Sequence, residues 1–161
     1  MIVWDTTLVS RLHPGGPIEH LLLDHARADD TIGITAPTVM EVARGLELTA
    51  VRRPSMSSAL EWFTRLAASD LVEILPLDRW SATVAGRVRA SHPVPPTGDR
   101  RKGTKPEQRA GWILDIQIAA CAWTHGRGLA TENLSDFRAL RRLMAKLYPG
   151  APPLEVSPPQ S

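Results

Sequence analysis

GWILDIQIAACAWTHGRGLATENLSDF, residues 111–137, is the stretch that decides the fold. From Ile113 to Trp123 the side chains are apolar almost all round, which is typical of a helix that is buried rather than half-exposed. Gly126 suits the end of that helix, Leu129–Thr131 predicts a short buried strand, and Ser135 is expected to cap the next helix.

A single carboxylate, Asp115, interrupts the apolar helix. A buried ionised carboxylate costs several kcal/mol unless another group pairs with it or coordinates it. The predicted helix from Gly111 onward offers no lysine or arginine as a partner. What neutralises Asp115 is therefore the question that the sequence poses.

The composition indicates a single domain with a core of its own. The chain has 161 residues, of which 43% are hydrophobic and 22% charged, and both fractions are ordinary for a globular protein. We expect one domain over residues 1–148, followed by a C-terminal edge strand and a flexible tail over residues 149–161. No apolar run is long enough to span a bilayer, and MIVWD does not resemble a signal peptide. Together with a lone cysteine, Cys121, this predicts a cytoplasmic protein without disulfides.

The net charge of +2 is unevenly distributed. Seven basic residues against two acidic ones lie between Arg87 and Arg109, a local excess of five positive charges. Such a stretch is either a solvated loop or a surface that meets a polyanion. The same region, residues 92–111, has four prolines and no periodicity, which predicts a long loop.

Short apolar segments alternate with helical patterns along the chain. The expected strands are Ile2–Trp4, Thr31–Thr35, Leu71–Leu75 and Leu129–Thr131, with an edge strand at Pro153–Val156. The expected helices follow Asp5, Gly16, Ala36, Pro54, Asp78 and Ser135. One carries Val39, Met40 and Leu46 on its buried side, and another carries Trp80, Val84 and Val88 on one side. This alternation predicts an α/β domain with a largely parallel sheet.

Such a sheet would gather distant acidic residues at one edge. Asp5 ends the first strand, Glu41 lies early in the helix after the second, and Asp115 lies early in the helix before the fourth; Asn133 and Asp136 follow that strand. Open α/β folds bind ligands at this carboxyl edge. Like charges there would repel unless a cation joined them, and oxygen ligands suit Mg²⁺ or Mn²⁺.

Each of these residues also has a purely structural interpretation. Asp5 could only cap a helix, Asp136 could only face a helix dipole, and Asn133 could be a turn residue. Glu41 could be solvent-exposed if the helix phase differs. Gly45 could permit a close approach between helices. Asp115 is the hardest to explain in this way, because nearly all its neighbours are apolar.

Three segments carry a resemblance to a known family. They are IVWDTTLVSRL around Asp5, TAPTVMEVARGLEL around Glu41 and DIQIAACAWTHGRGLATENLSDF from Asp115. The chain resembles the PIN-domain ribonucleases and, among them, the VapC-type toxins of bacterial toxin–antitoxin modules. In some members of the wider family a fourth acid stands where this chain has Asn133.

The resemblance implies a three-layer α/β/α domain and an Mg²⁺- or Mn²⁺-dependent endoribonuclease that acts on structured RNA such as tRNA or ribosomal RNA. It also implies a homodimer and a cognate antitoxin as partners. Asp5, Asp115 and Glu41 would then bind the metal, with Glu41 as an alternative general base. Thr6, Thr131, Asn133 and Asp136 would hold water or phosphate or complete the metal site. The candidates for gripping the RNA backbone are Arg100, Arg101, Lys102, Lys105, Arg109 and Arg142, with Arg127 as a further candidate.

Two other functions remain open from the residues. One is a catalytically silent PIN-like module that only binds RNA or protein. The other is a phosphoacceptor or phosphatase domain with Asp5 as nucleophile, although Thr6, Thr7 and Leu8 do not supply the further acid that such a site needs.

Overall fold

The computed structural model describes residues 1–96 and 105–159. Five parallel strands form one sheet in the order β3-β2-β1-β4-β5. The strands are β1 (Ile2–Trp4), β2 (Ile32–Thr35), β3 (Val72–Leu75), β4 (Gly128–Ala130) and β5 (Val156–Ser157). The predicted α/β class with a parallel sheet is confirmed.

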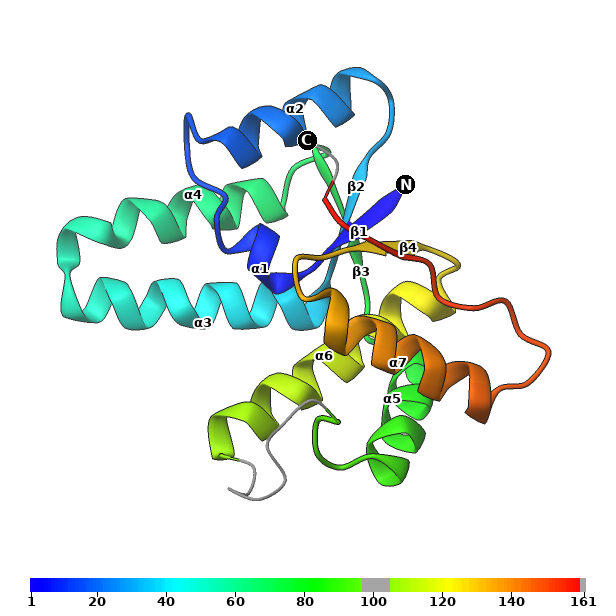
Figure 1. Ribbon diagram of the computed structural model, residues 1–161. Coiled ribbons are helices and arrows are strands. Elements are labelled where there is room, and N and C mark those ends of the chain that lie inside the picture. Colours follow the sequence, from blue (N-terminus) through cyan, green and yellow to red (C-terminus); the bar gives the residue numbers. More distant parts are fainter. Residues whose placement is uncertain (97–104, 160–161) are drawn as a thin grey trace.

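The helices cover both faces of this sheet (Figure 1). They are α1 (Thr6–Val9), α2 (Pro17–Arg27), α3 (Ala36–Arg52), α4 (Ser57–Ala67), α5 (Arg79–Ser91), α6 (Pro106–Thr124) and α7 (Leu134–Leu147), with a 3-10 turn at Pro54–Met56. None of these helices is both long and apolar enough to cross a membrane.

Alternation along the strands divides the core into two clusters. Val3 and Leu129 pack among α5, α6 and α7, whereas Trp4 and Ala130 pack among α1 to α4. Successive strand residues point to opposite faces, so each strand serves both clusters. The result is the three-layer α/β/α arrangement that the resemblance implies.

Gly33 in β2 allows the first of these clusters to close. A Cβ atom at this position would lie 2.8 Å from Leu75 Cδ1 and 3.1 Å from Val3 Cγ2. Such distances are below ordinary van der Waals contact, so these side chains occupy the space that a larger residue would need.

The sheet order places a topological switch point between β1 and β4. Chain connections lead from β1 to β2 and β3 on one side, and β4 and β5 lie on the other. Trp4 pairs with Ala130 in the register of these two strands. The next residues, Asp5 and Thr131, therefore leave the sheet side by side at its carboxyl edge, where open α/β sheets bind ligands.

Several local expectations were wrong. The buried helix begins at Pro106 rather than near Gly111, so the proline-rich connection is shorter than predicted. Ser135 does not cap α7; Asn133 occupies the N-cap position, and Ser135 Oγ donates to its Oδ1 at 3.4 Å. The edge strand is present but lies at Val156–Ser157.

The helix phases also differ in places from the predicted ones. Met40, expected on a buried side, is 60% exposed, and Trp80, expected on the same side of its helix as Val84 and Val88, is 62% exposed whereas those two valines are buried. Gly45 approaches nothing, because a Cβ there would have no neighbour within 4 Å. In a helix, a phase error of one residue is enough to turn a side chain from the core to solvent.

Candidate functional site

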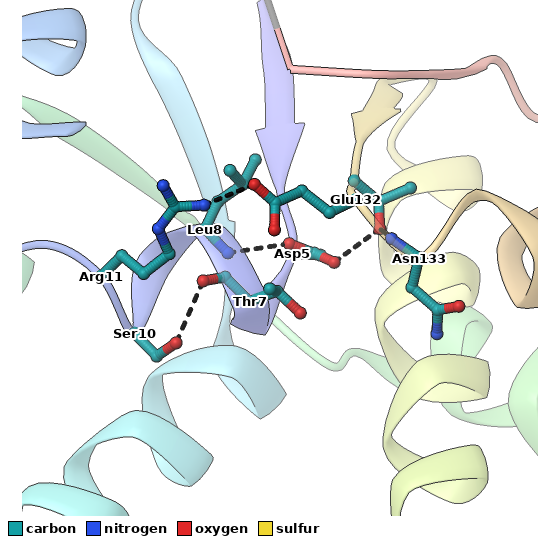
Figure 2. A network of polar contacts seen from close by, with 8 residues as sticks. Asp5, Thr7, Leu8, Ser10, Arg11, Glu132 and Asn133 are labelled. Carbon is teal, nitrogen blue, oxygen red and sulfur yellow. Dashed lines mark hydrogen bonds and ion pairs between the residues drawn. The ribbon is translucent and has the colours of Figure 1, made fainter. Parts of the chain in front are cut away.

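Asp5 lies at the carboxyl end of β1 with only 2% of its surface exposed (Figure 2). It caps α1, since its Oδ1 accepts a hydrogen bond of 3.0 Å from the Leu8 amide. Its Oδ2 accepts a second bond, of 2.6 Å, from the Thr131 hydroxyl. The structural role considered for Asp5 is therefore real, but it accounts for only one of the two carboxylate oxygens.

Thr131 connects Asp5 to the loop after β4. Its side chain is fully buried. The Thr131 hydroxyl accepts a hydrogen bond of 2.9 Å from the backbone N–H of Asn133 and donates its own hydrogen to Asp5. The strand register described above brings these groups together. Asp5 and Thr131 are 126 residues apart in sequence, and their contact links the N-terminal strand to the last third of the chain.

Asn133 brings two further carboxylates into the same site. Its Nδ2 donates to Asp136 Oδ2 at 3.1 Å and, more weakly, to Asp115 Oδ2 at 3.4 Å. Asp115 comes from α6, and Asp136 lies in the first turn of α7. These three side chains and Trp112 line a hollow of about 290 Å³, which we call the carboxylate hollow.

The electrostatics of Asp115 are unfavourable to its charge. Burial raises its pKa to about 7, and the neighbouring charges of Asp136 and Asp5 add to the effect. Burial also raises the pKa of Asp5, although the hydrogen bonds from Thr131 and Leu8 oppose this, and the charge of Glu132 adds to it. Two carboxylates that are pushed towards their neutral forms at one place indicate a site built for a positive ligand.

Glu41 is separate from this network. It lies in the second turn of α3, and its Oε1 accepts a hydrogen bond from the Arg44 guanidinium at 3.3 Å. Both partners are accessible, with 38% and 64% of their side chains exposed. Such a surface pair contributes little, about 0 to 1 kcal/mol, so it holds Glu41 only loosely.

A divalent cation fits the donors that the site offers. Within residues 1–96 and 105–159, no three Asp, Glu, His or Cys side chains form a ready set of metal ligands. Mg²⁺, however, is often held by only one or two carboxylates together with water and substrate phosphate. Asp5 and Asp115 supply these hard oxygen donors. Thr6 Oγ1, one residue from Asp5, is buried without a hydrogen-bond partner in the described part of the chain, as a hydroxyl that serves an additional ligand would be.

The basic candidates fall into three groups. Lys105, Arg109 and Arg142 are exposed on α6 and α7 or next to them. Arg100, Arg101 and Lys102 lie outside the described residues. Arg127 precedes β4 and therefore lies at the opposite edge of the sheet from the carboxylates.

Sequence reasoning missed one charged pair at the site. Arg11 forms an ion pair with Glu132, whose charge also acts on Asp5 (Figure 2). Glu132 directly follows Thr131, so its place after a strand was a usable signal. The pairing with Arg11 was not predictable, because it depends on where α1 ends in space.

The fold is shared with solved structures of low sequence identity. VapBC2 from Rickettsia felis, bound to a DNA fragment from its promoter, matches with a TM-score of 0.60 and 19% identity over 99% of this chain and 100% of that one. FitAcB from Neisseria gonorrhoeae matches with a TM-score of 0.60 and 20% identity, over 97% and 96%. DNA-bound VapBC from Salmonella typhimurium gives 0.57 and 21%, over 98% of each chain. At these identities the likeness concerns the fold.

The family assignment comes from a match to the sequence itself. No curated protein matches the chain. The model of the PIN domain, in contrast, matches residues 2–143, a range that contains all the carboxylates described above. Because this match covers far more than half of the chain, the protein belongs to the PIN-domain family.

Proposed function

We propose that this protein is a metal-dependent endoribonuclease and acts as a VapC-type toxin that a cognate antitoxin holds inactive. PIN domains are generally metal-dependent nucleases. The single observation that carries the proposal is a pair of carboxylates at the switch point of the sheet, the buried Asp5 and the half-buried Asp115. Burial raises the pKa of both carboxyl groups, and a bound cation would favour their charged forms.

Asp5 and Asp115 would hold Mg²⁺ or Mn²⁺, which lowers the pKa of bound water and stabilises charge on the departing oxygen. Thr131 fixes the orientation of Asp5 through its hydroxyl, and Asn133 fixes Asp115 and Asp136 through its amide. Glu41 can leave its weak pair with Arg44 and either bind the metal or accept the proton of the attacking water. Thr6 offers an unused hydroxyl to water or phosphate.

Asn133 bears on how many ions the site takes. It stands where some members of the family carry an acid, and its amide cannot contribute a negative charge. Asp136, which lies within hydrogen-bond reach of it, is the group that would complete the set. We therefore propose one strongly held ion between Asp5 and Asp115, with Asp136 as an outer acid.

The partners that we propose are RNA, a second copy of the chain and an antitoxin. The structural neighbours are VapBC and FitAB assemblies, three of them bound to DNA and one of these to a fragment from its promoter, which supports a toxin–antitoxin setting for this chain as well. The exposed Lys105, Arg109 and Arg142 are suited to the RNA backbone. A cytoplasmic location follows from this setting.

The decisive experiment incubates the purified protein with total RNA in EDTA, in Mg²⁺ and in Mn²⁺, and maps the ends of the products. We expect cleavage only with metal and products with 5′-phosphates. Asp115→Asn should abolish cleavage, whereas Asp70→Asn, at an exposed position far along the chain from the site, should not. Metal-independent cleavage, or full activity of Asp115→Asn, would refute the proposal.

The same experiment tests a second candidate, a catalytically silent PIN module. It is favoured by the absence, among residues 1–96 and 105–159, of three Asp, Glu, His or Cys side chains placed to hold a metal ion. Metal-insensitive RNA binding without any cleavage is its expected signature.

A further inference from the structure

A second hollow lies beside the carboxylate hollow, on the other side of the first half of α6. Its volume is about 620 Å³, roughly twice that of the carboxylate hollow. α3 and α6 form its walls, and these helices also pack against each other. We call it the side hollow; the lining residues that matter here are Met40, Arg44, Ile113, Leu114 and Gln117.

Gly111 is the boundary between the two hollows, because it lines both. A Cβ atom at Gly111 would meet nothing within 4 Å, so no packing contact requires glycine there. Leu114 and Asp115 are successive residues of α6 that open into the side hollow and the carboxylate hollow, respectively. A ligand at the carboxylates can therefore extend over a low, side-chain-free part of the helix.

The side hollow is lined by apolar side chains and by one side-chain amide that can form hydrogen bonds with a base. Ile113 and Leu114 are half-buried, and Met40 is 60% exposed although it is a large apolar side chain. Flat aromatic groups stack favourably on such surfaces, and thioethers adapt to their shape. The half-buried Gln117 amide adds one donor group and one acceptor, which is the pattern that reads base edges.

The charged residues that line the side hollow determine which part of a nucleic acid would enter it. Glu41 and Glu107 also line the side hollow, against one cation, Arg44. Two carboxylates repel the negatively charged phosphate. The edges of bases, in contrast, carry N–H groups that donate hydrogen bonds to carboxylate and amide oxygens. The sugar–phosphate backbone of the nucleic acid would thus stay at the rim of the side hollow, and a base would enter it.

We propose that the side hollow seats one unstacked nucleobase of the substrate RNA, next to the phosphate that is cleaved, and that Gln117 selects its identity. This inference rests on the proposed nuclease function. It adds that the substrate is single-stranded at this nucleotide, since a paired base cannot present its Watson–Crick edge to Gln117.

The test is a specificity swap. A randomised single-stranded RNA library is cleaved by the wild type and by Gln117→Glu, and the product ends are sequenced. A glutamate only accepts hydrogen bonds, so it favours guanine, whose N1–H and N2–H point the same way. We expect guanine at one position beside the cut to rise about fivefold or more relative to the wild type, the low end of what a bidentate contact provides.

A matched pair of variants tests the apolar lining of the side hollow. Met40→Ala should weaken the base preference at the same position, and Val51→Ala should leave it unchanged. Both residues are exposed apolar side chains of α3, at 60% and 73%, but only Met40 lines the side hollow. If both Gln117→Glu and Met40→Ala cleave with the wild-type preference, the subsite is refuted while the nuclease stands.

A binding arm separates the two proposals if no cleavage is seen. RNA oligonucleotides that differ in one base are titrated against each variant in EDTA, where the proposed metal-dependent hydrolysis cannot proceed, with fluorescence anisotropy as the readout. A base-dependent affinity that Gln117→Glu redirects towards guanine supports the subsite even in a silent module. Affinities that are equal for all bases and all variants overturn it.

Discussion

Asp115→Asn should make the metal-free protein more stable at pH 8. Burial and neighbouring charge raise the pKa of Asp115 from 3.8 to about 7 in the folded chain. Between these values the folded state binds the proton more tightly than the unfolded state, so stability falls as the pH rises through this window. Above pH 7 the full cost of the charge is present, at most about 4 kcal/mol for a shift of this size.

Asparagine keeps the shape and removes the charge. Its Oδ1 can still accept from the Asn133 amide that now donates to Asp115 at 3.4 Å. Loss of the charge-assisted part of that bond costs about 1 kcal/mol, which leaves a net gain of about 1 to 3 kcal/mol at pH 8. At pH 5 the wild-type carboxyl is mostly protonated in the folded state, so the gain should shrink to less than half.

The assay is urea denaturation in EDTA at pH 5 and pH 8, followed by the same titration with Mg²⁺. A metal that binds the folded wild type adds about 2.7 kcal/mol when its concentration is a hundred times the dissociation constant, and the variant should lose this gain. Asp70→Asn is the control, since Asp70 is exposed. An Asp115→Asn protein that is no more stable than the wild type in EDTA at pH 8, or whose advantage does not depend on pH, would refute the reasoning.

Three further predictions concern buried positions, one of them in the site. Thr131→Val removes the donor to Asp5 and leaves a buried carboxylate oxygen unpaired, so it should lower the unfolding free energy by about 1 to 3 kcal/mol in urea titrations; an unchanged value would show that the bond is dispensable. Gly33→Ala brings a methyl group to 2.8 Å from Leu75 Cδ1 and should cost about 1 to 3 kcal/mol, a loss that Leu75→Val in the same chain should partly restore in thermal melts. Burial raises the pKa of Cys121 to about 11, so iodoacetamide at pH 8 should label it only after unfolding; rapid labelling of the folded chain would contradict its burial.

The parts of the fold that follow from local pattern were predictable. The apolar run from Ile113 to Trp123, ended by Gly126, could only be a buried helix, and Gly126 indeed adopts a φ of 65° after it. The carboxylate of Asp115 is noticeable in that run because nearly all its neighbours in the sequence are apolar. A charged residue within an apolar run departs from the local sequence pattern, and such departures can be recognised from the sequence alone.

What depends on the positions of separate elements was less accessible. The contact between Asp5 and Thr131 follows from a parallel sheet in general, but the register that makes it direct cannot be derived from three-residue strands. Glu41 was expected with the other acids, yet it forms an ion pair with Arg44, three residues further along its own helix. A surface ion pair of this kind contributes less than about 1 kcal/mol of free energy. Sequence patterns do not resolve differences of that size, so the partner of an accessible side chain such as Glu41 could not be predicted.

The pairing of Trp4 with Ala130 has a consequence for how this chain can vary. A slip of one residue between these strands would send Trp4 to the wrong core cluster and separate the Asp5 carboxylate from the Thr131 hydroxyl at once. Insertions and deletions in β1 or β4 should therefore disrupt both the folding of the chain and the arrangement of the site. Changes in length are open to the chain only where no strand is involved, such as the connection between α3 and α4 at the far end of their helical hairpin (Figure 1).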